Sequence, residues 1–155
     1  MLCLTRLRWR KLRKGDGTAL VEFAIGSSVL ILLLLGIIEF GYLWYQKQII
    51  TNASREGARY GVTYKTTSTG VRLSPQNLSP SIQTVVSNYL SGRLPSGSFT
   101  IAVSGDGYSS TNGTEVKGLN LIVQVSCQNQ MDLLSGFIPS LADITFTAKT
   151  IMKCE

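Results

Sequence analysis

The longest apolar run in the sequence lies near the N-terminus. Fifteen consecutive uncharged residues extend from Ala24 to Ile38, and Phe23 with residues 40–45 lengthens the run to 23 residues, in which Glu39 is the only charge. A helix that rises about 1.5 Å per residue would span about 34 Å here, which exceeds the hydrocarbon core of a bilayer at about 30 Å. The pattern therefore predicts one membrane-spanning helix over residues 23–45.

Two other interpretations of this run compete with a membrane span. A cleaved secretory signal has a shorter apolar core that ends in an AxA-like site, and no such site closes this run. A buried core helix would have to be enclosed by the rest of a 155-residue chain, which is too small to cover so uniform an apolar surface. The aromatic residues Tyr42, Trp44 and Tyr45 at the end of the run are typical of a membrane interface.

Helical periodicity continues beyond the run. Ala53, Gly57 and Gly61 recur at intervals of four, so a helix would align them in a stripe of small residues that another backbone can approach closely. Packing against the protein's own sheet is favoured over contact with another subunit, and both remain open at this stage. The pattern predicts one long helix over residues 18–62.

The remaining residues, 63–155, predict a small α+β domain. A Thr/Ser/Gly-rich loop over 63–74 precedes a short helix, for which Ser79 is the expected N-cap and Pro80 the first helical residue. Alternating apolar positions then predict three mostly antiparallel strands, at 99–103, 119–127 and 144–152. A long Gly/Ser/Asn-rich loop is expected over 104–118, and a short helical turn or buried crossover over 131–138.

Charge and composition argue against several classes of function. The net charge is +6, but residues 1–17 hold six basic residues and one acidic residue, so the rest of the chain is almost neutral. A nucleic-acid-binding face would need that charge on the folded part. The chain has no histidine, only three cysteines, and no nucleotide-binding or calcium-binding motif. We therefore expect no enzyme activity, no catalytic residue, no metal and no cofactor.

The segment between the basic leader and the apolar run carries the most specific signal. A basic stretch ends in Gly17, and Glu22 follows five positions later, just inside the apolar run. This arrangement resembles the class III signal of type IV pilins and pseudopilins. Together with Leu35–Gly41 and Asn52–Tyr60, the segment resembles the TadE family, whose members are pseudopilins of the tight-adherence (Tad, Flp) pilus system.

The resemblance implies roles for four residues. A prepilin peptidase would cut between Gly17 and Thr18, on the cytoplasmic side, and would leave the apolar helix on the mature protein. The new α-amine of Thr18 and the carboxylate of Glu22 would pair between subunits during assembly, with Phe23 at the same contact. The chain would thus consist of a leader (1–17), a long helix (18–62) and an extracytoplasmic domain (63–155).

Two functions from different classes follow. The first is a minor pilin or pseudopilin that acts in pilus assembly and surface adherence, with prepilin peptidase, the inner-membrane Tad platform and other pilins as partners. The basic leader predicts an inner-membrane protein with its N-terminus inside and its C-terminus outside. The alternative is an unprocessed, signal-anchored binding module outside the cytoplasm, which does not need the cut after Gly17.

Two questions stay open in the sequence. A disulfide between Cys127 and Cys154 is disfavoured if strands 119–127 and 144–152 are antiparallel neighbours, because the two thiols would then lie near opposite ends of the pair. Glu39 could face another subunit or a polar partner within the membrane, or it could reach the outer headgroup region, and no role is assigned to it.

Overall fold

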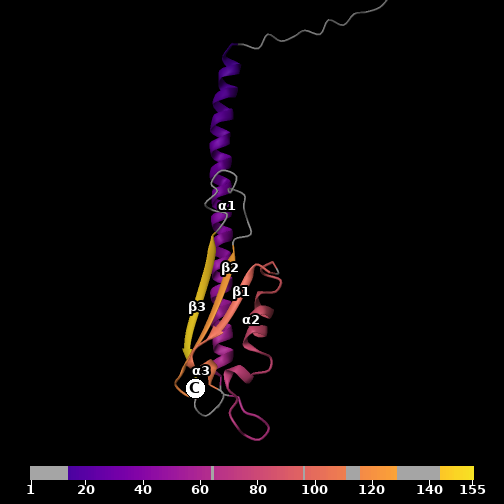
Figure 1. The fold of residues 1–155 in the computed structure, drawn as a ribbon. Coiled ribbons are helices and arrows are strands. Elements are labelled where there is room, and N and C mark those ends of the chain that lie inside the picture. Colours follow the sequence, from indigo (N-terminus) through magenta and orange to yellow (C-terminus); the bar gives the residue numbers. More distant parts are fainter. Residues whose placement is uncertain (1–13, 64, 96, 111–115, 129–143) are drawn as a thin grey trace, which may run out of the picture. The chain divides into compact units, whose positions relative to one another are not determined.

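The computed structural model describes residues 14–63, 65–95, 97–110, 116–128 and 144–155. The first element is the 49-residue helix α1 (Lys14–Val62), and the chain divides into two compact units within it, residues 1–38 and 39–155. We refer to these as the N-terminal unit and the C-terminal unit. Within its described part, the N-terminal unit is the first half of α1 alone (Figure 1).

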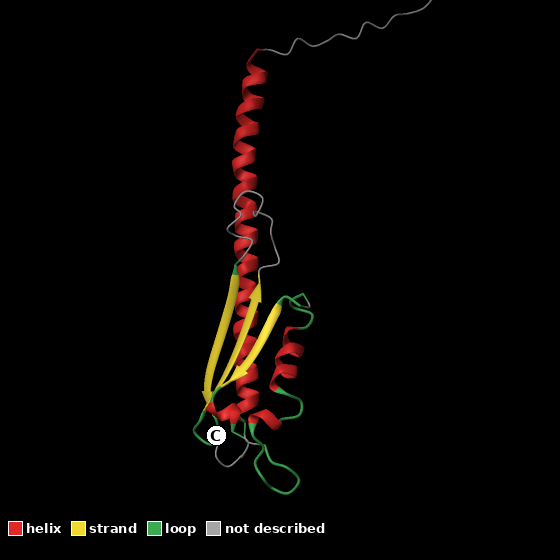
Figure 2. Ribbon diagram, viewed as in Figure 1, coloured by secondary structure: helices red, strands yellow, loops and turns green. Residues whose placement is uncertain are grey.

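The C-terminal unit combines helices with one antiparallel sheet. After α1 come the 3-10 helix η1 (Pro75–Asn77), helix α2 (Ile82–Leu90), strand β1 (Phe99–Ser104), the four-residue helix α3 (Asp106–Ser109), and strands β2 (Asn120–Gln128) and β3 (Thr145–Lys153). The strands lie in the order β1-β2-β3, and each neighbouring pair is antiparallel. Figure 2 shows the three strands together with the helices of this unit. The predicted α+β class is confirmed.

The core of this unit lies between the helices and one face of the sheet. Alternate residues of β2 are fully buried, as expected for a strand with one covered face. The second half of α1 and the inner face of α2 pack on that side, because a Cβ on Gly57 would contact Val86 of α2 and Val123 of β2. The largest fully buried apolar side chains are Ile50, Ile82, Leu90, Leu121, Val86, Val116, Val123 and Val125.

Two polar contacts join α1 to β3 on the same side of the sheet. The hydroxyls of Ser54 and Thr150 are hydrogen-bonded at 2.8 Å, and the Lys47 ammonium donates to the carbonyl of Thr147 at 2.6 Å. Strand β3 therefore runs beside the second half of α1, in the same direction (Figure 1).

Three local predictions need correction. Helix α1 begins at Lys14, before the expected start at Thr18. Helix α2 begins at Ile82 with Ser81 as its N-cap, because the Ser81 side chain accepts a hydrogen bond from the Thr84 amide, so Ser79 and Pro80 precede the helix. The expected loop over 104–118 contains helix α3 in its described part. The predicted turn over 131–138 lies outside the described residues.

Candidate processing and assembly site

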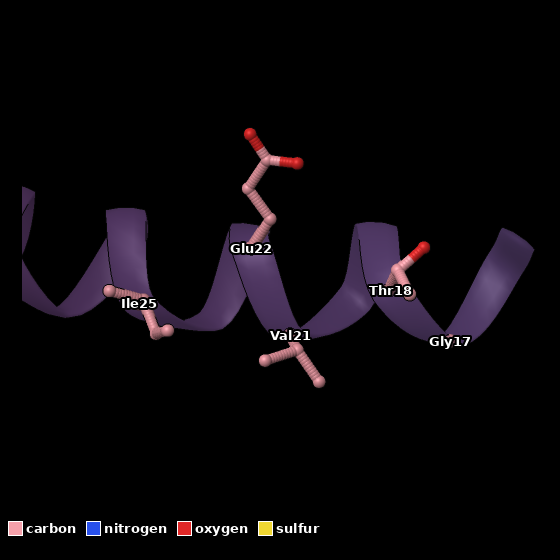
Figure 3. A pocket seen from close by; sticks show the side chains of 5 residues that line it. All are labelled: Gly17, Thr18, Val21, Glu22 and Ile25. Atoms are coloured by element: carbon pink, nitrogen blue, oxygen red, sulfur yellow. The ribbon is translucent and has the colours of Figure 1, made fainter.

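The residues of the predicted processing signal lie in the first turns of α1. Gly17 and Thr18 are helical, and a Cβ on Gly17 would meet no atom within 4 Å. Thr18 and Glu22 are four residues apart, so they lie on the same side of the helix. Figure 3 shows both side chains pointing to one side and Val21 to the other. The hollow that these residues line with Ile25 belongs to one helix and is open to the surroundings.

Glu22 is an exposed carboxylate at the start of an exposed apolar surface. Phe23 is 73% exposed, and Leu20 and Val21 on the preceding turn are also mostly exposed. A carboxylate among apolar groups is costly in a membrane unless a cation or a hydrogen-bond donor pairs with it. The site therefore presents a negative group beside the position where cleavage would create the Thr18 amine.

The apolar helix that follows is long enough to cross a membrane. No residue in its most apolar window is buried by the rest of the described protein. From Val29 to Leu34 the side chains are all at least half exposed. In water this surface would carry a large hydrophobic cost, which an apolar surrounding such as the bilayer core removes.

The three small residues predicted for helix packing lie elsewhere, in the C-terminal unit. Ala53 is fully buried, and Gly57 and Gly61 are buried as well. A Cβ on Gly61 would come within 2.7 Å of the Ile82 side chain and would also contact Leu121. Gly57 and Gly61 thus lie against the protein's own α2 and β2, which is the packing that the sequence favoured over subunit contact.

Two buried polar residues lie on the same face of α1, and no site was predicted at either of them. Glu39 is 3% exposed and Gln46, seven residues later, is fully buried. The position of Glu39 was left open by the sequence, and the structure buries its side chain. Neither amide atom of Gln46 has a hydrogen-bond partner among the described residues. The sequence signal for this shared face is the spacing of seven residues from Glu39 to Gln46 and from Gln46 to Ala53, which places all three on one side of the helix.

The cysteines lie apart in the C-terminal unit. The register pairs Cys127 with Phe146 and Asn120 with Lys153, so Cys154 lies near the opposite end of the β2-β3 pair. Cys127 and Cys154 are both free and buried, and burial raises the pKa of each thiol. Within the described ranges, no three His, Cys, Asp or Glu residues come together as metal ligands.

Comparison with known protein families bears on the helix that carries this site. Residues 17–59 match the family model described as TadE-like protein. This segment is TadE-like. The match begins at the glycine of the predicted processing signal and ends within the buried half of α1, so it covers less than a third of the chain. No curated protein and no solved structure matches the chain.

The TadE-like match confirms the resemblance drawn from Gly17, Glu22 and the two later motifs. Among the described residues, one helix is long and apolar enough to cross a membrane, and it lies within the matched segment, which suggests a single membrane anchor.

Proposed function

We propose that this chain is a minor pilin or pseudopilin of a Tad-type pilus, made with a leader and cut by a prepilin peptidase between Gly17 and Thr18. One observation carries the proposal: the TadE-like match starts at Gly17 and includes Glu22 at the entrance of an exposed apolar helix. A cut on the cytoplasmic side of that helix leaves the anchor on the mature protein.

The mature protein is held in the inner membrane by residues 23–45, with its N-terminus inside. The six basic residues of the leader favour this orientation, since positively charged segments stay on the cytoplasmic side. The remainder of the C-terminal unit then lies outside the cytoplasm. Its pilin-like partners share the same membrane, so subunit contacts form first between helices in the bilayer.

Glu22 selects the neighbouring subunit. Cleavage gives Thr18 an α-amine with an ordinary pKa of about 7.7–8.0, so it is mostly positive at neutral pH. Charges at the centre of a span cost about 2.5–3.5 kcal/mol each on insertion scales, and a fixed ion pair reduces that cost. A Glu22 carboxylate that meets the Thr18 amine of the next subunit, with Phe23 packed beside it, is stabilised only when the two helices are in register.

The subunit therefore acts by assembly, without a cofactor or catalytic residue of its own. Its proposed partners are the prepilin peptidase, the inner-membrane Tad platform and other pilins, and its cellular effect is adherence through the pilus. The energy for assembly comes from a separate component of the platform.

Complementation in the native host tests this function. A strain that lacks the gene is supplied with the wild-type chain, Glu22→Gln or the matched control Glu56→Gln, whose carboxylate binds Arg59 on the surface at 2.9 Å. We expect wild type and Glu56→Gln to restore pili and surface attachment. We expect Glu22→Gln to reach the membrane in normal amounts but to leave the cells without pili. Full piliation with Glu22→Gln, or without the gene, would contradict the proposal.

A further inference from the structure

Three exposed aromatic residues mark one level of α1 within the C-terminal unit. Phe40, Trp44 and Tyr45 are 66%, 60% and 49% exposed, and the rings of Phe40 and Trp44 lie 6.4 Å apart. Aromatic side chains of this kind prefer the boundary between lipid tails and water. We call this group the aromatic belt.

The start of β3 lies at the level of this belt. The hydrogen bond between Ser54 and Thr150 places these two residues at the same level. The contact between Lys47 and Thr147 does the same for an earlier turn of the helix and an earlier part of the strand. From Thr150 back to Thr145 the strand covers about 17 Å at about 3.3 Å per residue, and the helix covers the same distance in about eleven residues at about 1.5 Å each. Thr145 therefore lies level with residues 43–44.

The strand register brings other residues to the same level. Thr145 pairs with Gln128 at the end of β2, and Phe99 at the start of β1 pairs with Cys127. The backbone N–H of Gln128 donates a hydrogen bond to the carbonyl of Ser98 at 3.0 Å, which holds the turn before β1 at this end as well. We call Gly97, Ser98, Gln128 and Thr145 the Thr145 end of the sheet.

The described surface of the Thr145 end carries uncharged polar groups beside a few apolar ones. Thr145, Gln128 and Gly97 are exposed, and Ile144 beside them is half-buried. A shallow hollow of about 210 Å³ is lined by these three exposed residues together with Ser98, Phe99, Thr100, Ser126 and Cys127. Hydroxyl and amide groups can hydrogen-bond the phosphate and glycerol oxygens of phospholipids without the desolvation cost of a buried charge.

The helix gives this end of the sheet little freedom to move away from the belt. Helix α1 is continuous through Phe40, Trp44 and Ser54, and no linker separates the belt from the residues that hold β3. A belt at the outer boundary of the bilayer thus places the Thr145 end at the same boundary. The nearest surface of suitable chemistry is the headgroup layer of the membrane that the helix itself crosses.

We propose that the Thr145 end of the sheet contacts the phospholipid headgroups on the outer face of the membrane, so that the C-terminal unit rests on the bilayer before assembly. This inference rests on the proposed membrane span. It adds a second lipid contact, made by the folded unit, and a contact that must be broken when the subunit leaves the membrane.

Depth-dependent quenching tests the contact. Each variant carries one added cysteine at an exposed position. Thr145→Cys and Gln128→Cys lie at the Thr145 end of the sheet, and the matched controls Lys153→Cys and Asn120→Cys lie at the other end. The full chain carries Cys3→Ser, keeps its buried Cys127 and Cys154, and is labelled with an environment-sensitive fluorophore. It is then reconstituted in phosphatidylcholine–phosphatidylglycerol vesicles that contain a headgroup nitroxide quencher. The parent chain without an added cysteine measures background labelling.

The two ends of β3 are eight residues apart, or about 26 Å at about 3.3 Å per residue, which is enough for a clear difference in quenching. We expect labels at positions 145 and 128 to lose most of their fluorescence and labels at 153 and 120 to keep most of theirs. Equal quenching at both ends would overturn the inference.

A fluorophore at Leu32→Cys separates this result from a failure of the anchor. With a nitroxide placed in the middle of the acyl chains, a membrane-spanning helix predicts strong quenching at position 32. Quenching at position 32 without quenching at 145 would refute the headgroup contact alone. Absence of quenching at position 32 would refute the span, and with it the proposed function.

Discussion

The two halves of α1 differ in what covers their apolar side chains. In the N-terminal unit, Ile31 and Leu32 are at least half exposed, and no residue of the most apolar window is buried. In the C-terminal unit, Ile50 and Ala53 are fully buried by α2 and the sheet. One continuous helix therefore needs two different apolar surroundings, lipid for its first half and protein for its second.

The difference shows that composition alone does not decide what a helix packs against. From Val29 to Ile38 the first half is apolar on every side, as expected for a helix surrounded by lipid. The second half has one buried stripe and an exposed polar face that includes Lys47, Gln48 and Arg55. Such a stripe fits a helix that is covered on one side by a folded protein.

Truncation of an isoleucine should give the largest difference in unfolding free energy between the two halves of α1. Ile50→Ala is expected to lower the free energy of unfolding of the C-terminal unit by about 2–5 kcal/mol, since it removes buried methyl groups and leaves a cavity. Ile31→Ala, at a position 56% exposed, should leave that free energy unchanged. Urea titration of the full chain in detergent micelles, followed by near-ultraviolet circular dichroism, measures both. Equal effects would mean that the halves do not differ in packing.

A large side chain at a glycine should give the next largest contrast. Gly57→Leu should lower the unfolding free energy by about 1–3 kcal/mol or more, because the new side chain overlaps the Val86 methyl group. The matched control is Gly26→Leu, where a Cβ would meet nothing within 4 Å. The same titration should find the control as stable as the wild type. A stable Gly57→Leu protein would show that α1 is not packed against α2 as described.

Gln46 should give the smallest effect, in the opposite direction. Replacement by leucine removes a buried amide without a described partner, so Gln46→Leu is expected to raise the unfolding free energy by about 1–2 kcal/mol. Gln48→Leu alters the exposed face two residues later and should change it little. Destabilisation by Gln46→Leu would indicate that the amide makes a contact that stabilises the fold.

The elements of the fold were largely predictable because their periodicities are strong. The alternation from Leu119 to Cys127 and the helical stripe around Val86 each identified an element within about two residues of its bounds. The start of α2 was displaced because Ser79 and Ser81 are equally good caps by local chemistry. Pro80 is kept outside the helix by tertiary structure, since its carbonyl accepts the Tyr60 hydroxyl at 2.9 Å.

Features that depend on distant contacts were not predictable. Helix α3 has only four residues of low helix propensity, and it packs where Gly107 approaches the backbone of Asn120 and the Cys154 sulfur. Burial of Glu39 also depends on tertiary packing, which a local pattern does not report. The processing role of Gly17, Thr18 and Glu22 comes from the resemblance of the local motif and stays a prediction. The structure gives these three residues an exposed helical setting.

The most direct test of the central claim is the intact mass of the protein isolated from its native membrane, beside Gly17→Leu and the matched Gly26→Leu variant. The account predicts that wild type and Gly26→Leu lack residues 1–17 and begin at Thr18, whereas Gly17→Leu keeps the leader. A wild-type protein that retains its basic leader would contradict the pilin pathway and would favour an unprocessed, signal-anchored binding module.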